Sequence, residues 1–92
     1  MISTEDDVVA HLLPLSDFSD GDVRGLIDLS ARAAATGAPE DRQALADVLS
    51  VYELQGRAPA RTVWQSLSDA LDAGSEIATK LAPILSIVLM VA

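Results

Sequence analysis

The residues with the clearest potential for chemistry lie in an acidic segment near the N-terminus, DFSDGD at residues 17–22. Carboxylates grouped around a glycine are typical of a calcium-binding loop. If Gly21 took the sixth position of such a loop, however, Phe18 would fall on the third position and Ile27 on the twelfth. Both positions need oxygen ligands, which these side chains lack. We therefore predict that the segment is the capped start of a helix and not a metal site.

The other candidates for chemistry are one histidine and three pairs of acids. His11 is the only histidine, and the chain has no cysteine, so neither a thiolate site nor a two-histidine metal site can form. We expect His11 at a helix surface or boundary, because its spacing to serines and acids indicates no catalytic triad. The acidic pairs, which we expect to be solvated, are Asp6/Asp7, Glu40/Asp41 and Asp69/Asp72. We accordingly expect no catalytic residue, cofactor or metal, and predict that the protein is not an enzyme.

The charge of the chain limits its partners. The 92 residues carry 14 acids and 6 bases, for a net charge of −8. A field of this sign repels phosphate backbones, so we do not expect a nucleic-acid partner. The acidic N-terminus lacks the basic and apolar order of a secretory signal, and we expect a cytoplasmic protein. The preference of the whole chain for arginine over lysine is typical of GC-rich bacterial or phage genes.

The elements that position these residues follow from helical spacing and from stop and start signals. The signals are Pro14, Gly37 with Pro39, Gly56 with Pro59, and Gly74 with Ser75. They predict an all-α bundle with one domain over residues 1–92 and no sheet, with helices near 4–13, 20–36, 39–55, 59–73 and 75–90. The side chains that we expect to be largely buried together are Leu26, Ile27, Leu45, Val48, Leu49, Trp64, Leu67 and Leu85.

The C-terminal segment 81–92, LAPILSIVLMVA, is the most hydrophobic part of the chain. It carries no charge, and Ser86 is its only polar side chain. Helix is the preferred prediction, because a lone strand would have no partner, and Pro83 should kink that helix. A segment that is apolar on all sides must be covered by the protein's own core, by a second copy or by a membrane.

These observations predict a protein that acts by association, as a homo-oligomer or as an adaptor for a protein partner. The predicted helix near 20–36 presents mostly alanine along one side, so we expect an aliphatic patch to remain exposed as an interface, formed by Ile84, Ile87, Val88 and Val91. The acidic remainder would favour a basic partner surface. In helix number, length and acidity the chain resembles small death-fold adaptor modules, although no motif carries this resemblance.

The alternative is a small membrane-associated protein, similar to a holin or anti-holin or to the soluble part of an anchored protein, that uses the 81–92 segment. The uncharged run of this segment is shorter than the roughly 20 residues that a spanning helix needs. It also lacks aromatic residues at its ends and a basic flank. A membrane partner is therefore the less favoured of the two.

Overall fold

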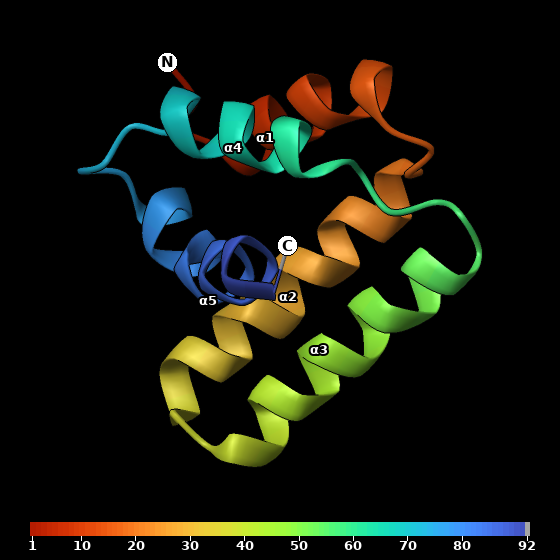
Figure 1. Cartoon of the computed structure of the whole chain (residues 1–92). Helices are drawn as coiled ribbons and strands as arrows, with labels where there is room; N and C mark the ends of the chain where they lie inside the picture. The colour runs from red at the N-terminus through yellow and green to blue at the C-terminus, as the bar shows by residue number, and fades with distance from the viewer. Residues whose placement is uncertain (92) are drawn as a thin grey trace.

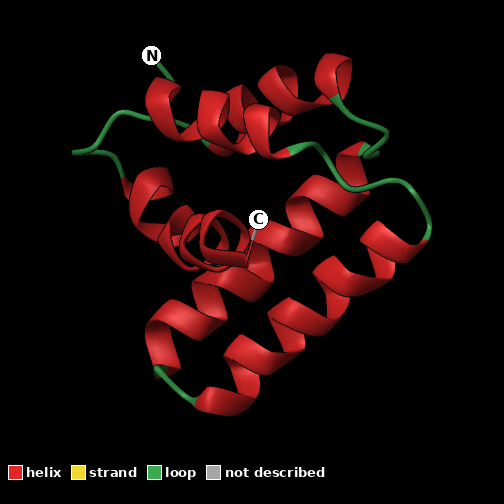
Figure 2. Ribbon diagram, viewed as in Figure 1, coloured by secondary structure: helices red, strands yellow, loops and turns green. Residues whose placement is uncertain are grey.

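The computed structural model describes residues 1–91 of the chain, with their side chains up to Met90. This part is a globule of α-helices without a strand, measuring 31 × 30 × 23 Å (Figures 1 and 2). Its five helices are α1 (Glu5–Leu12), α2 (Asp20–Thr36), α3 (Pro39–Leu54), α4 (Arg61–Ala70) and α5 (Glu76–Val91), with a short 3-10 helix, η1 (Leu13–Leu15), after α1. The predicted all-α fold of five helices is confirmed.

The two ends of α2 follow the predicted caps. Ser19 and Asp22 form a reciprocal capping box at the start of α2, and Gly37 ends that helix with a positive φ of 62°. At α1 the predicted start at residue 4 was wrong by one residue, because Thr4 is the N-cap and Glu5 the first helical residue. The Thr4 hydroxyl accepts the hydrogen bond from the Asp7 backbone N–H at 3.2 Å. The Ser3 backbone N–H donates in turn to the carboxylate of Asp7.

Helix α4 is shorter at both ends than the predicted range 59–73. It begins at Arg61, after the extended N-cap residue Ala60, and it ends at Ala70, because the N-terminus of the chain pairs with the segment that follows. The Ile2 backbone N–H donates to the Ala70 carbonyl at 2.7 Å, and the Asp72 N–H donates to the Ile2 carbonyl at 2.8 Å. This isolated parallel bridge between Ile2 and Leu71 requires extended backbone, so Leu71 adopts φ −67° and ψ 137°. The Ile2 side chain is 7% exposed and belongs to the core.

The helices form two groups with α5 between them. The helices α2 and α3 make an antiparallel pair joined by a short turn, and α1 and α4 lie together on the other side (Figure 1). Helix α5 packs mainly on α2 and also contacts α4 and α3. The apolar C-terminal helix is therefore covered from three directions within one chain.

The core is aliphatic, with Trp64 and Phe18 as its buried aromatic residues. Of the predicted core set, six are buried: Leu26, Ile27, Leu45, Leu49, Trp64 and Leu67. The other two, Val48 and Leu85, are only half-buried and pack against the edge of this cluster. Phe18 closes the end of the core. The centroid of its ring lies 4.9 Å from that of the Tyr52 ring and 6.1 Å from that of the Trp64 ring.

Two polar clusters join the helix ends. Arg24 on α2 forms ion pairs with Glu5 and Asp6 on α1, at 2.9 and 2.8 Å, and with Asp20 one turn earlier at 2.7 Å. The hydrogen bonds that Arg24 donates to Asp20 and Asp6 raise the pKa of its guanidinium, so it stays charged. Because these groups are substantially exposed, the cluster fixes geometry more than it contributes stability.

The second cluster is centred on Asp22, inside the DFSDGD segment. Asp22 accepts hydrogen bonds from the Ser19 backbone N–H at 2.9 Å, from the Tyr52 hydroxyl at 3.0 Å and from Arg57. The Ser19 N–H is the main cause that lowers the pKa of Asp22 below its usual 3.8. Burial, followed by the hydrogen bond to Asp22, raises the pKa of Tyr52. The DFSDGD segment is thus the capped start of a helix, as predicted. Its Asp22 also joins this helix start to the end of α3 through Tyr52.

Candidate functional site

The residues predicted to form an interface on α5 divide between the core and its margin. Ile84 is 1% exposed and packs in the centre of the bundle, so its assignment to an exposed patch was wrong. Ile87 and Val88 are half-buried, and the side chain of Val91 lies outside the described part. The physical reason is the period of the helix: Ile84 shares a stripe with Leu81 and Ile77, and this stripe faces inward.

The outward face of α5 carries small or flexible side chains. Ala82, Ser86 and Met90 recur at spacings of four residues, and all three are exposed, Met90 by 79%. Pro83, beside this face, lies inside a helix that continues on both sides of it, and the predicted kink stays a prediction. Among the described residues, no helix combines the length and hydrophobicity needed to cross a membrane.

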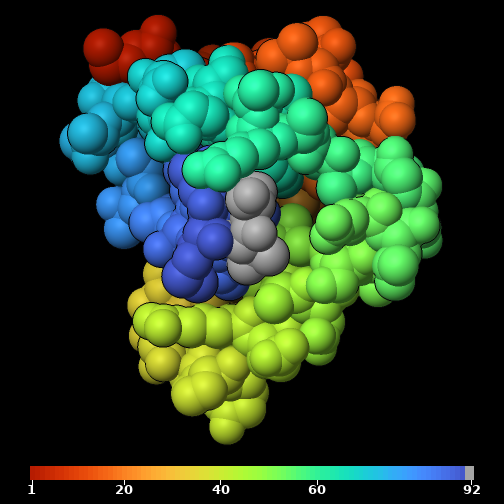
Figure 3. Space-filling view, in the orientation of Figure 1, coloured from red at the N-terminus to blue at the C-terminus, as the bar shows by residue number. Residues whose placement is uncertain are grey.

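Ile87 and Val88 border an apolar groove where α3, α4 and α5 meet. The groove has a volume of about 400 Å³. Figure 3 views the molecule from the side on which these three helices come together. The lining residues come from α3, from the loop before α4, and from α4 and α5: Ala46, Leu49, Ser50, Glu53, Ala58, Pro59, Ala60, Arg61, Trp64, Ile87 and Val88.

The groove arises because α5 packs mainly on α2 and meets α3 only marginally. Gly56 ends α3 with a positive φ of 69°, and the Arg57 N–H donates to the Tyr52 carbonyl at 2.9 Å. The chain then passes buried Pro59 before α4 begins. Alanines in this loop and on α3 leave the space open, since a methyl group fills little volume.

The floor of the groove is apolar and its rim is charged. Leu49 and Trp64 are 9% and 4% exposed, and they form the inner surface together with Ile87 and Val88. The rim carries Glu53 from α3 and Arg61 from α4. Both side chains are exposed, and within residues 1–90 neither forms an ion pair. This arrangement suits an apolar side chain held between two opposite charges.

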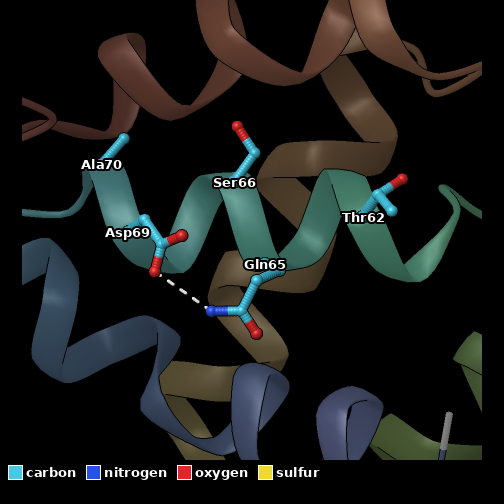
Figure 4. A pocket seen from close by; sticks show the side chains of 5 residues that line it. All are labelled: Thr62, Gln65, Ser66, Asp69 and Ala70. Atoms are coloured by element: carbon cyan, nitrogen blue, oxygen red, sulfur yellow. Dashed lines mark hydrogen bonds between the residues drawn. The ribbon is translucent and has the colours of Figure 1, made fainter.

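A second depression, of about 520 Å³, lies along the exposed face of α4 and is more open and more polar. Figure 4 shows the side chains that line it: Thr62, Gln65, Ser66, Asp69 and Ala70. The Gln65 amide donates to Asp69 one turn later at 3.1 Å, along the helix surface. Such a pair supports the helix and provides no enclosed volume for a ligand.

The structure brings His11 close to a serine, which the sequence did not indicate. The His11 Nε2 atom lies 3.3 Å from the Ser66 Oγ atom, so α1 and α4 are joined by this hydrogen bond. In the described part of the chain no carboxylate is hydrogen-bonded to the other ring nitrogen. A nucleophilic serine needs its base oriented by a third group and its oxyanion stabilised, and this exposed pair supplies neither.

Four of the six residues in the predicted acidic pairs are exposed, as expected, whereas Asp41 and Asp72 are half-buried. Asp7 accepts from the Ser3 backbone N–H, which lowers the pKa of this carboxyl, and Asp41 accepts from the Thr36 hydroxyl. Asp72 accepts from the Gly74 backbone N–H at 3.2 Å in the turn before α5. Among the described residues, no group of three or more histidines or acids is placed to hold a metal ion.

Comparison of the chain with models of protein families, with curated proteins and with solved structures finds no match. A function must therefore be inferred from the geometry of the groove. Sequence reasoning identified four of its lining residues, Leu49 and Trp64 as core and Ile87 and Val88 as interface. It missed Ser50, Glu53 and Arg61. Ser50 and Glu53 recur at helical spacing after Ala46, but that pattern alone is typical of any solvated helix edge.

Proposed function

We propose that this protein is a non-enzymatic helical interaction module that acts by self-association or as an adaptor for a protein partner. The observation that carries the proposal is the apolar groove between α3, α4 and α5, with the half-buried Ile87 and Val88 on its wall. A groove of this size, apolar inside and charged at its rim, fits a side chain or a helical segment of another protein. The proposal includes a cytoplasmic location, with which the acidic, cysteine-free sequence is compatible.

The membrane alternative receives less support. It needs the 81–92 segment to leave the bundle, whereas Leu81 and Ile84 are 2% and 1% exposed in the core. Moving these two side chains out of the core would lose roughly 1.5–3 kcal/mol of stabilising free energy from burial for each of them. Flotation of the protein with vesicles of anionic and of neutral lipid would test this alternative directly, and we expect no co-flotation with either.

The groove is tested by placing a photo-cross-linking amino acid at Ser50 and irradiating living cells. Ser50 is exposed and lines the groove. The matched control is the same amino acid at Ala44, which is exposed on the same helix but does not line the groove. We expect a cross-linked product from position 50 and none from position 44. No product from either position, or equal products from both, would contradict a role of the groove in association.

A further inference from the structure

We propose that the occupant of the groove is a second copy of this chain, related by a two-fold axis, with Glu53 of each copy facing Arg61 of the other. The inference rests on the proposed function and chooses one of its two partners. It follows from the charges at the rim of the groove and from exposed apolar side chains on the helices that form its walls.

The rim of the groove is complementary to itself. Glu53 belongs to α3 and Arg61 to the first turn of α4, so the two charges lie on different walls. They form no ion pair with each other in the part of the chain described. In a two-fold dimer the same surface meets itself, and a residue on one wall faces the opposite wall of the partner. Two Glu53–Arg61 pairs would then form across the interface.

A basic partner, which the net charge of −8 would otherwise favour, fits this rim less well. The rim of the groove is not uniformly acidic, because it carries Arg61. The positive charge of Arg61 would repel a cationic occupant. The occupant must present an acid to Arg61 and a base to Glu53, at the spacing of these two residues. A second copy meets this condition without any further assumption.

The chain also carries the apolar side chains that the groove would receive. Leu54 is 88% exposed and follows Glu53 directly at the end of α3, and Met90 is 79% exposed one turn after Ile87. Leu54 belongs to α3 and Met90 to α5, which are two of the helices that form the groove, although neither side chain lines it. Exposed apolar side chains next to an apolar hollow give a surface with both a projection and a recess. A two-fold contact places the projection of each copy in the recess of the other.

The test is a charge exchange, read by sedimentation equilibrium over a range of protein concentrations. Glu53→Arg and Arg61→Glu each place like charges opposite one another twice in the dimer, so we expect each to weaken dimerisation by at least about tenfold. The double variant restores both pairs in reversed order and should dimerise nearly as well as the wild type. The controls are Asp47→Arg and Arg42→Glu, which make the same charge changes at exposed positions outside the groove.

All four substituted residues are exposed, so circular dichroism should confirm that the variants remain folded. A second variant, Leu54→Glu, should abolish the dimer by placing a charge in the apolar recess. A wild type that stays monomeric at all concentrations overturns the second copy as occupant. A cross-link from position 50 to a different protein would then leave the proposed function standing. If the wild type dimerises but the double variant does not regain dimerisation, the two-fold Glu53–Arg61 arrangement is overturned.

Discussion

Replacing Ile84 by alanine measures how fully the C-terminal helix is enclosed by the rest of the chain. The side chain is 1% exposed and lies in the core beside Leu81. The substitution removes three carbon groups, which at about 0.8 kcal/mol each accounts for roughly 2.4 kcal/mol of lost burial. A cavity adds to this loss, because close-packed neighbours relax only in part. We therefore expect the free energy of unfolding to fall by about 3–4 kcal/mol.

The same substitution at Ile87 is the matched control. Ile87 is half-buried at the edge of the groove, where water or neighbouring side chains can fill the space, so Ile87→Ala should cost clearly less, about 1 kcal/mol. Urea unfolding, followed by circular dichroism at low protein concentration, gives both values. The slope of the unfolding free energy against urea concentration should be the same for both variants and the wild type. A domain of this size has a stability of about 5–14 kcal/mol, so both variants should remain folded.

Two results would refute this reasoning. If Ile84→Ala lowered the free energy of unfolding by less than about 1 kcal/mol, the side chain would not be enclosed by its own chain. If the effect of Ile84→Ala depended strongly on protein concentration while that of Ile87→Ala did not, the buried position would belong to an interface between copies. Either result would return Ile84 to the surface patch that the sequence predicted.

Three further outcomes are expected. Gly25→Ala, in the open interior of α2, should stabilise the protein by about 0.5–1 kcal/mol in thermal unfolding, whereas Gly37→Ala, at φ 62°, should destabilise it by about 1–2 kcal/mol. Because the pKa of Asp22 is lowered in the folded state, its contribution is complete above 3.8 and is lost as the pH falls through the lower, folded value. Urea titrations should accordingly show Asp22→Asn less stable than the wild type at neutral pH, with the difference vanishing in acid. Ile2→Ala should lower stability by about 2 kcal/mol and accelerate hydrogen exchange of the Asp72 N–H, and unchanged exchange would mean that the bridge does not depend on this side chain.

The helices were predictable because their ends are encoded locally. Gly37 and Pro39 mark the end of α2 and the start of α3, and both boundaries were predicted at the observed residues. The end of α4 was not predictable in this way. It depends on a backbone pairing with Ile2, about 70 residues earlier in the chain, and no signal near Leu71 indicates it.

The orientation of α5 was beyond the reach of periodicity. A helix that is apolar on all sides gives no pattern that separates Ile84, which is buried, from Ile87, which is half-exposed. A similar ambiguity affects α2, where Ala33 is 2% exposed and the adjacent Ala34 faces solvent. Neighbouring alanines differ too little for the sequence to choose between them.

The groove could not be predicted, because its existence depends on how far α3 and α5 diverge. Its lining side chains come from three helices and one loop, and none is unusual in its own segment. Glu53 and Arg61 became informative only when the fold placed them on two walls of one hollow. Sequence reasoning reached the class of function that we propose, through the excess of apolar residues on α5, but with Ile84 misplaced.

The central position of α5 has a consequence for the order in which the protein can fold during its synthesis. Helix α5 lies between the α2–α3 pair and the α1–α4 pair, and the ribosome makes it after these four helices. Helix α1 can already pack on α2, but Leu81 and Ile84 complete the core only when α5 has emerged. The nascent chain therefore passes through a stage in which apolar surface that α5 will cover is open to chaperones and proteases.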